Sequence, residues 1–171
     1  MSNPAPHPAT LSEQQLLAHC SLHTTRRSGP GGQHRNKVET AVVLTHVSTG
    51  IQAEANERRS QAENREVALF RLRQRLAETI RCPVAVHSLP TELWRSRTPK
   101  KKISVSSEHV DFPALLSEAL DRVTAFEFDL AGAAADLNVS STQLARFLQQ
   151  SPIAWQWVNA ERQARQLRPL H

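Results

Sequence analysis

One long helical pattern, over residues 60–82, limits the folds that this sequence can adopt. Its apolar positions recur at mostly helical spacing: Val67, Phe70, Leu72, Leu76 and Ile80. Pro83 ends the pattern, because proline disfavours helix at the residue before it. Two segments with strand character, 40–45 and 51–56, precede it, and Gly50 suits a hairpin turn between them. We therefore expect an α+β fold in which a small β-sheet packs on one long helix.

Shorter elements are expected on either side of this arrangement. Ser12 suits the N-cap of a short helix that carries Leu16 and Leu17. Residues 20–26 alternate loosely and predict a strand. A further short strand is predicted at 84–87, after the long helix.

Charge is distributed unevenly along the 171 residues, whose formal net charge is +5. Residues 1–110 hold 16 Lys and Arg against 9 Asp and Glu, a charge of +7, and residues 111–171 hold 5 against 7, a charge of −2. The change follows a basic run, 95–102. The sequence therefore predicts a basic domain with a basic linker over 1–110 and a smaller helical domain over 111–171.

The second domain reads almost entirely as helix. Helices are predicted over 113–123 and from Pro152 to about residue 167. Between them, Ala134, Asn138 and Leu144 have the spacing of a helix-turn-helix unit, in which Asn can adopt the turn conformation usually given to Gly. Such a unit can serve only for packing. If it reads nucleic acid, the residues facing the ligand are Ser140, Ser141, Gln143 and Arg146.

Composition excludes several classes of protein. Two cysteines, Cys20 and Cys82, exclude a disulfide scaffold, and no apolar run approaches the roughly 18 residues that a membrane span needs. The first ten residues lack Lys and Arg, which argues against a targeting leader, so we expect a cytoplasmic protein without a membrane partner. We expect neither cofactor nor metal. The alternative is a zinc site formed by Cys20, His23, Cys82 and His87.

The most informative segment is a glycine-rich loop, 26–37, which holds three of the five glycines in the chain. It lacks the spacing of a phosphate-binding P-loop and supplies neither a carboxylic acid nor a thiol. Any reaction here must therefore use backbone N–H groups and an amide, through positioning and electrostatics. The alternative interpretation is a surface turn.

Four motifs follow one another from this loop. They are Gly-Pro-Gly-Gly-Gln-His-Arg-Asn-Lys at 29–37, Thr-Ala-Val-Val-Leu-Thr-His at 40–46, Ser-Thr-Gly-Ile at 48–51 and Arg-Ser-Gln-Ala-Glu-Asn-Arg at 59–65. This succession resembles the peptidyl-tRNA hydrolase domain of class I peptide chain release factors, over residues 20–82. Four linked motifs make the resemblance far more specific than a lone Gly-Gly-Gln.

The resemblance implies a site and its partners. The partners are the ribosomal RNA of the peptidyl transferase centre and peptidyl-tRNA, whose ester is hydrolysed. Gly31 and Gly32 would set the backbone, and the N–H of Gln33 would stabilise the oxyanion. The Gln33 side chain would admit water and is the family's site of methylation by a glutamine methyltransferase. Loop support is assigned to Ser28, Gly29 and Asn36.

Cationic residues around this site are candidates for RNA contact through phosphate pairing. They are Arg26, Arg27, His34, Arg35, Lys37, Arg59, Arg95, Arg97, Lys100, Lys101 and Lys102. A solvated face is the alternative for the arginines, and a disordered linker is the alternative for residues 95–102.

The resemblance to the short, codon-independent members that rescue stalled ribosomes is greater than to decoding release factors. About 19 residues precede the hydrolase region and nothing is inserted within it, so a decoding domain is not expected. The chain departs from those members in ending with a helical domain of negative charge rather than a basic tail. Two alternatives remain: a helix-turn-helix regulator with an inactive loop, and a hydrolase specialised for damaged or split ribosomes.

Overall fold

A computed structural model describes residues 6–25 and 40–171 of the protein. The chain divides into two compact units. The first, the sheet unit, spans Pro8–Leu76. The second, the helical unit, spans Ala77–His171 and includes, of the described N-terminal residues, Pro6 and His7. The predicted domains divide at residues 110 and 111, and that division remains a prediction.

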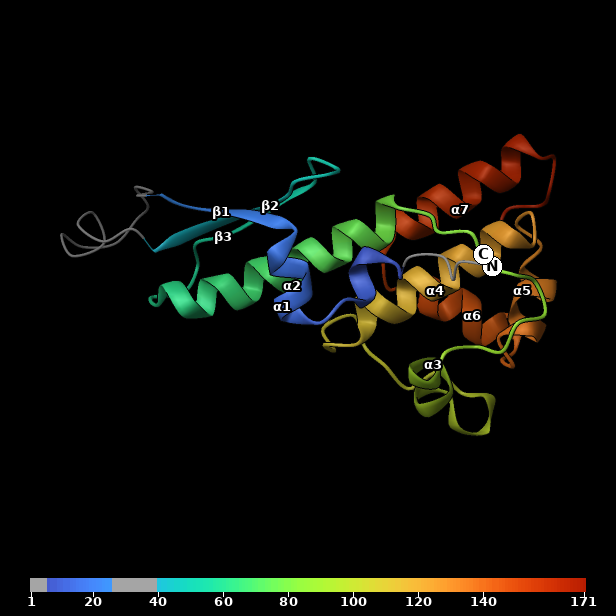
Figure 1. Cartoon of the computed structure of the whole chain (residues 1–171). Helices are drawn as coiled ribbons and strands as arrows, with labels where there is room; N and C mark the ends of the chain where they lie inside the picture. The colour runs from blue at the N-terminus through green and yellow to red at the C-terminus, as the bar shows by residue number, and fades with distance from the viewer. Residues whose placement is uncertain (1–5, 26–39) are drawn as a thin grey trace. The chain divides into compact units, whose positions relative to one another are not determined.

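The sheet unit contains three antiparallel strands, β1 (Cys20–Thr25), β2 (Ala41–His46) and β3 (Gln52–Ala55), in the order β1-β2-β3 (Figure 1). Leu44 of β2 pairs with Leu22 of β1 and with Ala53 of β3. The predicted hairpin between β2 and β3 is confirmed, and Gly50 in its turn has a φ of 71°, a conformation that glycine adopts without steric cost.

Two helices pack with this sheet. α1 (Glu13–Ala18) begins at a capping box, in which Ser12 and Gln15 each bond the other's backbone, and α2 (Gln61–Thr79) runs along the strands (Figure 1). The buried face combines alternate residues of the strands with helically spaced residues of α2, namely Val42, Leu44, Ala53, Ala55, Ala68, Leu72 and Leu76. This match of a period of two with a period of 3.6 confirms the α+β prediction.

The helical unit contains α3 (Glu92–Arg97), α4 (Phe112–Ala125), α5 (Leu130–Asp136), α6 (Ser141–Leu148) and α7 (Pro152–Ala164). An aromatic cluster holds α3, α4 and α6 together: the ring of Phe147 lies 6.0 Å from that of Trp94 and 5.2 Å from that of Phe112. Asn138, in the turn between α5 and α6, has a φ of 55°, the conformation expected for it. Among the described residues, no helix is long and apolar enough to cross a membrane.

Residues 84–87 do not form the strand that we predicted. Buried Arg122 of α4 donates hydrogen bonds to the carbonyls of Ala85 (3.4 Å) and Ser88 (3.1 Å). The backbone N–H of His87 donates to the Asp136 carboxylate at 3.0 Å. Backbone groups that a strand would use in a ladder are thus bonded to side chains of the helical unit, and this explains the error.

Candidate active site and nucleic-acid contacts

The two strand ends beside the glycine-rich loop lie next to each other. β1 ends at Thr25 and β2 begins at Ala41, and these two residues are paired in the sheet. The segment 26–39 connects them. Many of the predicted site residues lie in that segment, outside the described residues: Arg26, Arg27, Ser28, Gly29, Gly31, Gly32, Gln33, His34, Arg35, Asn36 and Lys37.

A buried asparagine holds the downstream end of this segment. The Asn64 side chain, 0% exposed, donates from Nδ2 to the carbonyl of Thr40 at 2.7 Å and to that of Arg58 at 3.0 Å. Its Oδ1 accepts from the N–H of Arg58 at 2.9 Å. Asn64 is part of the 59–65 motif, and no role was predicted for it from the sequence. The sequence pattern that could have pointed to a role for Asn64 is a polar residue at a position of an amphipathic helix that is expected to be buried.

A pocket of about 270 Å³ lies in the same unit, between β1, β2 and the first turns of α2. Its lining residues are Leu22, Val42, Gln61, Ala62 and Arg65. These side chains include no carboxylic acid, thiol or imidazole. The walls of this pocket therefore supply no general base.

Arginines of α2 mainly bind their own unit. Arg71 holds the Glu57 carboxylate with two hydrogen bonds, of 2.6 and 3.3 Å, and donates to the carbonyl of Glu54 at 2.8 Å. Burial raises the pKa of Glu57, but hydrogen bonds from the N–H groups of Asn56 and Glu57 and from Arg71 outweigh it and lower the pKa. Arg59, by contrast, is exposed and pairs with no group in the described part of the chain.

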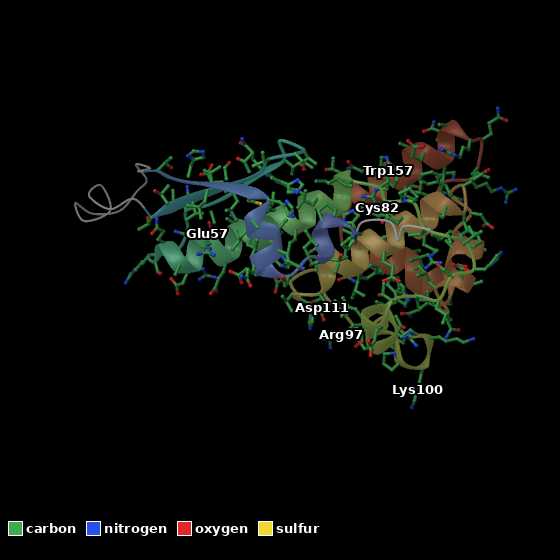
Figure 2. The ribbon with its side chains drawn as sticks, in the orientation of Figure 1. Glu57, Cys82, Arg97, Lys100, Asp111 and Trp157 are labelled. Carbon is green, nitrogen blue, oxygen red and sulfur yellow. The ribbon has the colours of Figure 1, made fainter. Side chains whose placement is uncertain are left out.

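The helical unit carries a basic turn, which we define as Arg95 and Lys100–Lys102. All four side chains are exposed, and Lys100 lies at the tip of the turn (Figure 2). Arg97 is different, because its guanidinium binds the Asp111 carboxylate at 2.7 Å (Figure 2). Of the five cations predicted between residues 95 and 102, the structure thus presents four to solvent and engages one.

This basic turn is ordered, not the disordered linker considered as an alternative. Trp94 is 0% exposed, and its indole Nε1 donates to the carbonyl of Leu137 at 2.9 Å. After the turn, the N–H of Ile103 donates to Oε1 of Gln143 at 3.2 Å. The cations therefore lie between two points that are fixed to the helical unit.

The chain matches the RF-1 domain over residues 16–109, more than half of its length. It belongs to the RF-1 domain family. The match begins within α1, at residue 16, and includes the rest of the sheet unit, the glycine-rich loop and the basic turn. Helices α4 to α7 lie beyond it.

Individual relatives cover a smaller part. The chain is 48% identical over 71 residues to peptide chain release factor 1 of Malacoplasma penetrans (strain HF-2), covering 40% of this chain and 20% of that protein. It is 57% identical over 53 residues to peptide chain release factor 2 of Acidovorax sp. (strain JS42), covering 31% of this chain and 14% of that protein. The chain thus spans a fifth or less of the length of these curated relatives.

Beyond the RF-1 domain match, the α5–α6 pair has its predicted nucleic-acid face partly covered. Ser140 caps α6 by accepting from the N–H of Gln143 at 3.2 Å, and the Gln143 side chain is used by Ile103. Gln150, at the other end of α6, donates to the carbonyl of Val105 at 3.1 Å. Ser140, Ser141 and Arg146 remain exposed, so Gln143 is the one of the four predicted residues whose side chain is bonded outside the pair in the described part of the chain. The role of the pair stays a prediction.

The zinc ligand set considered above is not supported by its geometry. Cys20 and His23 both lie in β1, three residues apart, and such residues point to opposite faces of a strand. His87 is largely exposed, with its Nδ1 3.4 Å from the Asp136 carboxylate. Cys82 instead lies near other side chains of the helical unit.

One group of ligand-type atoms does converge in the helical unit. His7, Cys82 and Asp121 have ligand atoms within 4.8 Å of one another. The Arg81 guanidinium lies 3.6 Å from the Asp121 carboxylate, so a fixed cation already neutralises that charge and would repel a metal ion. Burial raises the pKa of Asp121 to about 6, although the Cys82 N–H and Arg81 act to lower it. We assign this group to the core of the helical unit.

Proposed function

We propose that this protein hydrolyses the ester of peptidyl-tRNA on the ribosome and so releases the nascent chain. The observation that carries the proposal is the complete succession of four motifs, with Gly31-Gly32-Gln33 in the first, inside the matched RF-1 domain. The relatives that share 48–57% identity with this region are named peptide chain release factors. The partners would be ribosomal RNA and peptidyl-tRNA, and a cytoplasmic location belongs to the same proposal.

The chemistry needs no side-chain base. The N–H of Gln33 would donate to the oxyanion that develops at the ester carbonyl, and the Gln33 side chain would admit water and exclude larger nucleophiles. Gly31 and Gly32 would give the backbone the freedom to present that N–H. Removal of one oxyanion donor costs about 3 kcal/mol in comparable acyl-transfer sites, or roughly a hundredfold in rate. Methylation of Gln33 by a glutamine methyltransferase belongs to this proposal and is tested by mass spectrometry of the native protein.

The finer proposal is that release does not require a stop codon, as in ribosome rescue. It extends the expectation, drawn from the sequence, that the chain resembles the short, codon-independent members of the family. Arg59 and the basic turn are proposed to contact RNA phosphates, because they are exposed cations. Arg97 is the weaker candidate, since Asp111 already binds it.

Peptide release from ribosomes carrying labelled peptidyl-tRNA tests both levels of the proposal. Empty, sense-codon and stop-codon A sites are compared for the wild type, Gly32→Ala and Gln33→Pro. We expect release at all three sites by the wild type and almost none by the variants. Normal release by a folded Gly32→Ala protein would refute the hydrolase assignment, and release only at stop codons would refute codon independence.

A further inference from the structure

Asn64 contacts three segments of the sheet unit, and its side-chain hydrogen bonds all go to backbone atoms. It lies in the first turn of α2, where its own N–H donates to the carbonyl of Ser60 at 3.1 Å. Its amide binds Thr40, which precedes β2, and Arg58, in the link between β3 and α2. The side chain therefore specifies where the backbone at Thr40 lies relative to α2.

We propose that Asn64 is a positioning residue for the glycine-rich loop, acting through Thr40. This inference rests on the proposed function. The strand ladder holds the two ends of segment 26–39 only as far as the Thr25–Ala41 pair, and Thr40 is one residue beyond it. The carbonyl of Thr40 belongs to the peptide that joins Thr40 to Ala41, and the hydrogen bond from Asn64 fixes that peptide, the last one before β2. An oxyanion donor must be held within about 0.5 Å of its productive position. The position of the backbone at Thr40, which follows Gln33 in the chain, therefore affects the reaction.

An asparagine is required by the pattern of donors and acceptors. The amide supplies two N–H donors to two carbonyls and one oxygen to an N–H. An aspartate of the same shape keeps the bond from the Arg58 N–H, but it places an oxygen opposite the carbonyls of Thr40 and Arg58. Asn64→Asp therefore breaks the link to Thr40 with minimal change in side-chain volume.

The test uses the full-length protein in single-turnover peptide release. Asn64→Asp and Asn64→Ser are compared with the wild type, with Gly32→Ala and with a substitution of Leu72, a buried residue of α2 that makes no hydrogen bond to Thr40. Leu72→Val or Leu72→Ala is chosen according to which lowers the urea midpoint of the sheet unit by the same amount as the Asn64 variants. Hydrogen exchange of β2 peptides verifies that each variant is folded under the assay conditions.

We expect the Asn64 variants to release peptide ten- to a hundredfold more slowly at saturating protein, with a half-saturating concentration within twofold of the wild type. The matched Leu72 variant should keep the wild-type rate. Three results would each overturn the positioning role. The Asn64 and Leu72 variants could release peptide at equal rates, the Asn64 variants could differ from the wild type only in a higher half-saturating concentration, or both Asn64 variants could fail to fold. If the wild type and Gly32→Ala release peptide at the same rate, the proposed function itself fails. If Gly32→Ala is slow but the Asn64 variants release peptide at the wild-type rate, the proposed function stands and the positioning role fails.

Discussion

The stability of the helical unit should depend on pH through one carboxyl group, that of Asp121. Its side chain is 4% exposed, and burial raises its pKa from 3.8 to about 6 in the folded protein. Well below pH 3.8 the group is protonated in both the folded and the unfolded states. As the pH rises through 6 the folded state must ionise a buried acid, which the unfolded chain does more easily. The shift corresponds to at most about 3 kcal/mol of stability, lost between pH 4 and pH 7.

Asp121→Asn isolates this contribution. The amide oxygen can still accept the hydrogen bond that the Cys82 N–H donates to the carboxylate at 2.9 Å, but the side chain no longer ionises. His7 also titrates: burial lowers its pKa, which removes stability as the pH falls below about 6.5. Because the ligand atoms of His7 and Asp121 lie within 4.8 Å of each other, the two groups are coupled, so both proteins are compared in a His7→Gln background.

Intrinsic fluorescence is a suitable probe, because all three tryptophans of the chain, Trp94, Trp155 and Trp157, lie in the helical unit. Urea unfolding at half-unit steps from pH 4 to pH 7.5 gives the free energy of unfolding for both proteins. We expect the value with Asp121 minus the value with Asp121→Asn, both in the His7→Gln background, to fall by up to about 3 kcal/mol across this range. A difference that stays constant with pH, or that grows as the pH rises, would refute the reasoning.

Three further substitutions test other parts of the structure. Joint replacement of Lys100–Lys102 by glutamine should weaken ribosome binding and make its salt dependence shallower, measured by pelleting at several salt concentrations, while the fluorescence-detected urea midpoint is unchanged. Trp94→Phe removes the hydrogen bond to Leu137 and should lower the free energy of unfolding by about 1–2 kcal/mol, measured by urea titration; an unchanged value would contradict the role given to that bond. Gly132→Ala would place a Cβ 2.8 Å from the Asp129 carboxylate that caps α5, so thermal melting should show a lower midpoint, and an equal or higher one would disprove the clash.

The elements were predictable where local pattern and tertiary packing agree. The alternation before and after Gly50 and the helical spacing of Leu72 and Leu76 specify the sheet and α2, because each pattern matches the face that is buried. The turn at Asn138 was predictable for a similar reason, since few residues tolerate a φ of 55°. The error at 84–87 arose because Arg122, distant in sequence, binds the backbone there.

The site was predictable only in part. The glycine-rich loop was found from its composition and from the motifs around it, and its residues stay predictions. The role of Arg97 depends on Asp111, fourteen residues away, and that of Asn64 on Thr40, twenty-four residues before it. Such pairings are set by the tertiary fold. A sequence pattern therefore shows which residue is present but not which partner it binds.

The hydrogen bonds from α2 to β3 have a consequence for association between molecules. The N–H of His46 bonds the carbonyl of Ile51, so in the alternating antiparallel ladder the carbonyls of Gln52 and Glu54 point away from β2, toward the open edge of the sheet. Arg75 donates to the first of these carbonyls and Arg71 to the second. Two guanidinium groups one helical turn apart thus occupy the acceptors that another strand would need. These two contacts disfavour the addition of a strand from a second copy at the β3 edge and so act against edge-to-edge aggregation there.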